Sequence, residues 1–81
     1  MRTFGFDLRA LEVFVTTAKT GNMTVASNQL AISQSSVSQI LAQLEASLGV
    51  TLLDRTVRPV ELTVAGRYFY DQSIYLSLIH I

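Results

Sequence analysis

The stretch from Met23 to Gly49, MTVASNQLAISQSSVSQILAQLEASLG, decides the fold of this chain. It predicts two helices joined by a tight turn, and at about 100° per residue the second helix has two different sides. Its apolar side comprises Val37, Leu41, Leu44 and Leu48. Its other side comprises Ser35, Ser38, Gln39, Ala42 and Ala46, flanked by Ser36 and Gln43. Exposed helix faces usually have charged residues, whereas short hydroxyls and amides can read base edges in a major groove. A face that is merely polar is the alternative.

The size and composition of the chain limit the possibilities. Its 81 residues allow one small domain, which buries only about 60% of its unfolded surface and benefits from a partner. Hydrophobic residues make up 49%, which indicates a globular chain, and the absence of cysteine excludes disulfides and thiolate metal sites. No signal peptide is readable, and the apolar stretch 74–81 is far shorter than the ~20 residues of a spanning helix. We therefore expect a cytoplasmic protein with no membrane partner.

The charge balance gives a mixed indication about nucleic acid. The net charge is zero, whereas DNA-binding domains are usually basic. However, Arg55, Arg58 and Arg67 follow the two helices within a short span. The sequence therefore predicts a local basic patch rather than a basic domain.

The segments around the central stretch complete a helical core. Apolar residues before it recur at helical spacing: Leu8, Leu11, Phe14, Val15 and Ala18. Asp7 is the expected N-cap of this first helix, and Gly21 is its expected end. Either Asn22 or Thr24 caps the second helix. Ala31 and Ile32 form the turn, Ser33 caps the third helix and Gly49 ends it. Three helices with this turn predict a helix-turn-helix core, whose third helix enters the groove.

After Gly49 the pattern changes to alternation. Val50, Leu52 and Leu53 precede a polar turn, residues 55–59, and Val60 and Leu62 follow it. This alternation predicts a short two-stranded hairpin with arginines at its tip. Such a hairpin beside a helix-turn-helix is a wing, whose arginines would meet phosphates or the minor groove. A solvated loop is the alternative.

A fourth helix is predicted after the hairpin, with Thr63 as its N-cap. Its apolar and aromatic stripe comprises Val64, Ala65, Tyr68, Phe69, Gln72, Tyr75, Leu76 and Ile79. Because the first three helices are expected to close a small core by themselves, this stripe predicts a partner surface. Folding back onto the core is the alternative.

Two other function classes are alternatives to DNA binding. The single histidine, His80, is next to the end, and the chain has no H-E-x-x-H pair, phosphate-binding glycine loop or metal-ligand spacing. We therefore expect no enzyme, no cofactor and no metal. A protein-interaction adaptor suits four amphipathic helices and zero net charge. Only DNA binding would show a steep salt dependence.

Residues 7–70 resemble the N-terminal DNA-binding domain of LysR-type bacterial transcriptional regulators. The motifs that carry the resemblance are Asp7-Leu8-Arg9-Ala10-Leu11, Phe14, Gly21-Asn22-Met23-Thr24, Ala26, Leu30, Ser33-Gln34, Val37-Ser38, Gln43-Leu44-Glu45, Leu48-Gly49-Val50, Leu52-Leu53-Asp54-Arg55, Leu62-Thr63 and Ala65-Gly66. The resemblance implies a mainly α, winged helix-turn-helix domain over residues 1–62. It also implies a linker helix over residues 63–81 that pairs with its mate in a homodimer. The targets would be inverted repeats in promoters. A small effector would bind a downstream domain that is absent here, so the chain looks like a fragment.

The sequence departs from the family pattern in the third helix. Ser35 and Ser36 stand where the family often has proline and alanine, and Gln39 and Ala42 stand where it often has basic residues. The tail from Ile74 to Ile81 also lacks the charged character expected of a linker helix.

The candidate site residues fall into three sets. The predicted base contacts are Ser35, Ser36, Ser38, Gln39 and Gln43. The predicted phosphate contacts are Thr24, Ser33, Gln34, Arg55 and Arg58. The predicted dimerisation residues are Tyr68, Phe69, Gln72, Tyr75 and Leu76.

Overall fold

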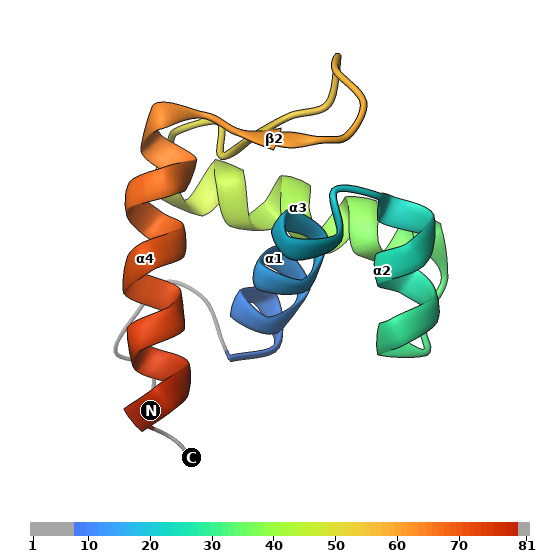
Figure 1. Cartoon of the computed structure of the whole chain (residues 1–81), viewed down its shortest axis with the longest axis horizontal. Coiled ribbons are helices and arrows are strands. Elements are labelled where there is room, and N and C mark those ends of the chain that lie inside the picture. The colour runs from blue at the N-terminus through green and yellow to red at the C-terminus, as the bar shows by residue number, and fades with distance from the viewer. Residues whose placement is uncertain (1–7, 80–81) are drawn as a thin grey trace.

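The computed structural model describes the backbone of residues 8–79 and the side chains of residues 8–75. The helices are α1 (Leu8–Thr20), α2 (Met23–Leu30), α3 (Gln34–Leu48) and α4 (Val64–Ile79), and the strands are β1 (Leu53–Asp54) and β2 (Glu61–Leu62). Helices α1, α2 and α3 pack together, and the hairpin lies along α3 (Figure 1). Helix α4 packs against α1 and β2, on the side of the domain away from α2. This arrangement confirms the predicted winged helix-turn-helix followed by a long helix.

Local capping explains where α2 and α3 begin and end. The side chain of Asn22 accepts a hydrogen bond from the backbone N–H of Val25, which makes Asn22 the N-cap of α2. Ser33 caps α3, and Gly49 ends that helix in the left-handed region at φ +73°. The side chains of Asn22 and Ser33 accept from N–H groups that a helix end leaves unpaired. Asp7, the predicted cap of α1, lies outside the described residues.

The tight turn of the helix-turn-helix is the segment between α2 and α3. Ala31 adopts the left-handed conformation at φ +60°. Its N–H donates to the carbonyl of Asn28, and the N–H of Ile32 donates to the carbonyl of Ser27. These bonds close the end of α2 and fix the direction in which α3 leaves.

The apolar side of α3 forms the centre of the core. Its residues Val37, Leu41 and Leu44 are fully buried, as the helical spacing predicts, while Leu48 is half-buried. The core is completed from α1 and the hairpin by Ala10, Val13, Phe14, Leu52, Leu53 and Val60. The side of α3 that faces solvent is therefore fixed by the packing of its opposite side.

Helix α4 is part of this core, which corrects the expectation that three helices close it. Phe14 is completely buried, and the rings of Phe69 and Tyr70 lie over it at centroid distances of 5.4 and 6.2 Å. The folding-back alternative therefore holds for one face of α4. Phe69 packs against its own chain on one side and is partly buried, and its predicted contact with a second copy stays a prediction. Tyr68 and Tyr75, on another face, are 70% and 63% exposed.

The hairpin joins α4 through a close backbone contact. Strands β1 and β2 are antiparallel, with Leu53 opposite Leu62 and Asp54 opposite Glu61. The N–H of Thr63 donates to the carbonyl of Leu52 at 3.0 Å, and the Thr63 hydroxyl accepts from the N–H of Gly66 at 2.9 Å. Thr63 is therefore the N-cap of α4, as predicted.

Candidate nucleic-acid interface

The outer face of α3 is open to solvent over its whole length. Ser35, Ser38, Gln39, Ala42, Gln43 and Ala46 are exposed, and Ser36 is half-buried. The helix has no lysine or arginine, and its single charged residue is Glu45. All five predicted base-contact residues are therefore at least partly accessible, on a surface that donates and accepts hydrogen bonds without a net positive charge.

A group of hydroxyls marks the N-terminal end of α3. The Ser33 hydroxyl accepts from the N–H of Ser36 at 3.1 Å and donates to the Ser36 hydroxyl at 2.9 Å. The hydroxyl oxygens of Ser33 and Ser35 lie 3.2 Å apart. Ser33, predicted to contact phosphate, already has a structural role as the cap of this helix.

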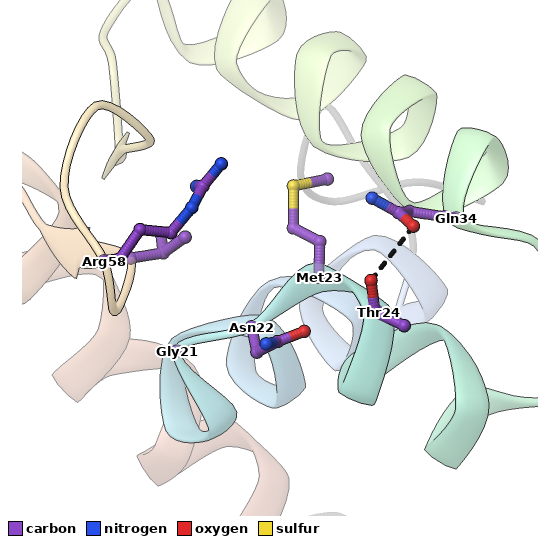
Figure 2. Close-up of a pocket in the computed structure, with 7 residues that line it drawn as sticks. Gly21, Asn22, Met23, Thr24, Gln34 and Arg58 are labelled. Atoms are coloured by element: carbon purple, nitrogen blue, oxygen red, sulfur yellow. Dashed lines mark hydrogen bonds between the residues drawn. The ribbon is translucent and has the colours of Figure 1, made fainter.

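A pocket lies where α2, α3 and the wing meet. It has a volume of about 200 Å³ and is lined by Gly21, Asn22, Met23, Thr24, Gln34, Arg58 and Val60. In Figure 2, Arg58 stands on one side, Thr24 and Gln34 stand on the other, and Met23 lies between them. The Thr24 hydroxyl donates to Oε1 of Gln34 at 3.1 Å. Three of the five predicted phosphate-contact residues therefore share this pocket.

The electrostatics of the pocket favour an anion. Arg58 is exposed and provides a positive charge from the wing. The first turn of α2 borders the pocket, and a helix N-terminus has a partial positive charge and unpaired N–H groups. A phosphate group would meet both, although the chain as a whole has zero net charge.

Arg55 has a structural role, and its predicted contact with phosphate stays a prediction. Its guanidinium lies 3.3 Å from Oε1 of Glu45. The other carboxylate oxygen of Glu45 accepts from the N–H groups of Leu52 and Leu53 at 2.7 and 3.2 Å. One carboxylate on α3 thus fastens the base of the wing and holds Arg55 beside it.

This role of Glu45 was not predicted from the sequence. The available signal was a single acidic residue in a helix otherwise free of charge, close to the helix end. Because α3 offers no cation, the partner that Glu45 has in this structure comes from the following segment.

Asp54 orders the other side of the wing. Its carboxylate accepts hydrogen bonds from the hydroxyl and the N–H of Thr56. The hydroxyl bond first, and the backbone bond second, lower the pKa of Asp54 below its ordinary 3.8. The carboxylate is therefore charged at neutral pH and can accept both hydrogen bonds.

The predicted basic patch is less concentrated than the sequence suggested. Arg55 is paired with Glu45, and Arg67 lies on α4 with its guanidinium 5.9 Å from the centre of the Tyr70 ring. This leaves Arg58 as the member of the trio that borders the pocket.

A second exposed surface runs along α4. Val64, Tyr68 and Tyr75 are 92%, 70% and 63% exposed, and Gln72 is also exposed. The side chain of Leu76, predicted to be at the same surface, lies outside the described side chains. Contact of this face with a second copy stays a prediction.

Two further properties of the described residues concern metals and membranes. Within residues 8–75, no group of three His, Cys, Asp or Glu side chains is arranged to hold a metal ion. Among the helices that the structure describes, none combines the length and apolar character needed to cross a bilayer.

Comparisons with known proteins agree with this geometry. The family model described as "Bacterial regulatory helix-turn-helix protein, lysR family" matches residues 8–67. The probable cat1 operon transcriptional activator of Acinetobacter lwoffii is 47% identical over 68 residues, which are 84% of this chain and 22% of that protein. The HTH-type transcriptional regulator TcbR of Pseudomonas sp. strain P51 is 40% identical over 83% of this chain and 23% of its own length. The chain thus spans between a fifth and a quarter of the length of these curated relatives.

Solved structures of protein–DNA complexes are also similar. The BenM DNA-binding domain in complex with benA site 1 DNA has a TM-score of 0.86 and 38% identity, covering 88% of this chain and 80% of that chain. The CbnR DNA-binding domain in complex with DNA has a TM-score of 0.87 and 36% identity, covering 93% and 86%.

Proposed function

Because this chain belongs to the lysR family of bacterial regulatory helix-turn-helix proteins, we propose that it recognises promoter DNA as part of a transcriptional regulator. It would act in the cytoplasm, as a homodimer on inverted repeats. A small effector would bind a part of the regulator outside this chain. The observation that carries the proposal is the open, uncharged polar face of α3 beside the cationic wing pocket.

The outer face of α3 would read the bases. Gln39 and Gln43 are exposed one turn apart, and a glutamine amide can make a bidentate contact to the major-groove edge of adenine. Ser35, Ser36 and Ser38 would supply short donors and acceptors nearer the helix N-terminus. Small side chains let the helix backbone approach the floor of the groove closely.

The wing pocket would hold the phosphate backbone. Arg58 supplies the charge, Thr24 and Gln34 supply hydrogen-bonding groups, and the first turn of α2 adds its N–H groups. Two further phosphate contacts are proposed. Ser33 would make one from the helix end that it caps, and Arg55 would make the other from the base of the wing, where it pairs with Glu45.

The exposed side of α4 would pair two chains. Tyr68, Gln72, Tyr75 and Leu76 form the proposed contact, while Phe69 supports it from the core side. A symmetric dimer places two copies of α3 on successive major grooves, so its sites have two-fold symmetry.

Selection of duplexes from a random pool tests this proposal. The expected product is an inverted repeat, bound by two chains according to the mass of the complex. Affinity should fall steeply with salt concentration, because phosphate contacts release counterions. An absence of enrichment together with salt-independent binding would instead favour an adaptor.

Two variants separate the proposed roles on the selected duplex. Gln39→Ala should lose discrimination at one base pair of each half-site, by about 1–3 kcal/mol. Arg58→Ala should weaken binding to selected and random duplexes alike. It should also reduce the salt slope, which is the steepness of log affinity against log salt concentration, by about 1. Equal losses for both variants on both kinds of duplex would contradict this division.

A further inference from the structure

The wing is tied to the turn between α1 and α2 by a contact that involves none of the proposed DNA-contacting groups. The N–H of Val60 donates to the carbonyl of Gly21 at 2.9 Å. Val60 itself is only 6% exposed and belongs to the core. The base of β2 is therefore anchored to the residue that immediately precedes the N-cap of α2.

Gly21 leaves no space between the two segments. A Cβ atom at this position would lie 2.7 Å from Cβ of Pro59, a separation that real Cβ atoms essentially never show. The contacted atom belongs to a proline ring, which cannot swing away as the end of a flexible side chain could. Gly21 also has φ +67°, a conformation that glycine adopts at no steric cost.

This contact lies directly beside Arg58 in the chain, and Nη1 of Arg58 also donates to the carbonyl of Arg55 at 3.4 Å. Arg58 directly precedes Pro59, and it shares the pocket with Thr24 and Gln34 (Figure 2). If the wing moved away from Gly21, its cation would leave the neighbourhood of the α2 N-terminus. We propose that Gly21 is a positioning residue, which docks Pro59 and Val60 so that Arg58 and α2 engage one stretch of phosphate backbone. This inference rests on the proposed DNA-binding function.

The test is the salt dependence of DNA affinity for Gly21→Ala, measured on the selected duplex and a random duplex. Displacement of Arg58 should lower the salt slope by about 0.9, as expected for one lost phosphate contact. Arg58→Ala should give the same reduction. The double variant should show no further reduction, because the second change removes a contact already lost.

Gly49→Ala is the matched control. Gly49 also has a positive φ, +73°, but no atom lies within 4 Å of a Cβ placed there. Both variants therefore carry similar backbone strain, while only Gly21→Ala collides with the wing. Gly49→Ala should lose stability and keep the wild-type salt slope.

A second variant covers the case in which Gly21→Ala does not fold. Pro59→Gly removes the ring at an exposed position and changes no charge. Its salt slope is expected to fall by about 0.9, through displacement of Arg58, and combining it with Arg58→Ala should give no further fall. In either variant, the Val60 amide should exchange its hydrogen faster relative to amides within α1.

The outcomes distinguish this inference from the function on which it rests. Wild-type chain that binds no duplex would contradict the proposed function. Wild-type chain that binds, together with folded Gly21→Ala or Pro59→Gly variants that keep the full salt slope, would contradict the positioning role alone. Equal slope changes in Gly21→Ala and Gly49→Ala would also overturn it.

Discussion

Gly66→Ala tests the contact that joins the wing to α4, because two physical effects predict opposite signs for the change in stability. Gly66 lies in the first turn of α4. Alanine is a better helix former than glycine by up to about 1 kcal/mol, so helix propensity alone predicts greater stability. The packing predicts the reverse.

The magnitude follows from the position of the added methyl group. A Cβ at Gly66 would lie 1.9 Å from the carbonyl oxygen of Leu52 and 2.9 Å from its carbonyl carbon. Both partners are backbone atoms, so the hairpin or α4 must move by about 1 Å to reach the shortest tolerated separation. That movement also stretches the bond from the Thr63 N–H to the Leu52 carbonyl. Overpacking of this kind costs about 1–3 kcal/mol.

The measurement is thermal and urea unfolding followed by circular dichroism. At about 0.05–0.15 kcal/mol per residue, a chain of this size has only about 4–12 kcal/mol to lose. We expect the thermal unfolding midpoint of Gly66→Ala to fall by about 5–20 °C, because 1 kcal/mol shifts the midpoint of a small domain by about 4–8 °C. Val64→Ala, at a 92% exposed position in the same turn, should change little. A Gly66→Ala midpoint equal to or above that of wild type would refute the steric argument.

Three further predictions concern the core and the wing. Leu44→Ala removes a fully buried side chain and should cost about 2–5 kcal/mol in urea unfolding; an unchanged midpoint would show that the site is not packed. Glu45→Ala leaves the N–H groups of Leu52 and Leu53 without their acceptor and should cost about 1–3 kcal/mol. A cost no larger than that of an exposed ion pair would contradict the role of Glu45 in fastening the wing. The lowered pKa of Asp54 adds stability that is complete above its ordinary value of 3.8 and disappears as the pH falls through the lowered folded-state value. Asp54→Asn should flatten the acid limb of the stability profile, and an unchanged limb would assign acid sensitivity to other carboxylates.

Helix positions were predictable because their signals are local. The cap at Ser33, the glycine at Gly49 and the apolar spacing of α3 all act within a few residues. Thr63 likewise identified the start of α4. These interactions do not depend on how the rest of the chain is arranged, so a single sequence reveals them.

Contacts between distant segments were harder to predict. The pairing of Arg55 with Glu45 and the covering of Phe14 by Phe69 depend on where the hairpin and α4 turn back. An arginine in a polar turn has the same sequence signature whether it faces solvent or a carboxylate. An aromatic stripe likewise does not show which of its members face a partner.

The central claim is that the uncharged outer face of α3 enters the groove. The most direct measurement is NMR titration of the 15N-labelled chain with the selected duplex, observing backbone and side-chain amides. We predict that the side-chain amides of Gln39 and Gln43 and the backbone amides of residues 34–39 show the largest changes. Unchanged α3 amides, with the largest changes confined to α1 instead, would contradict the account.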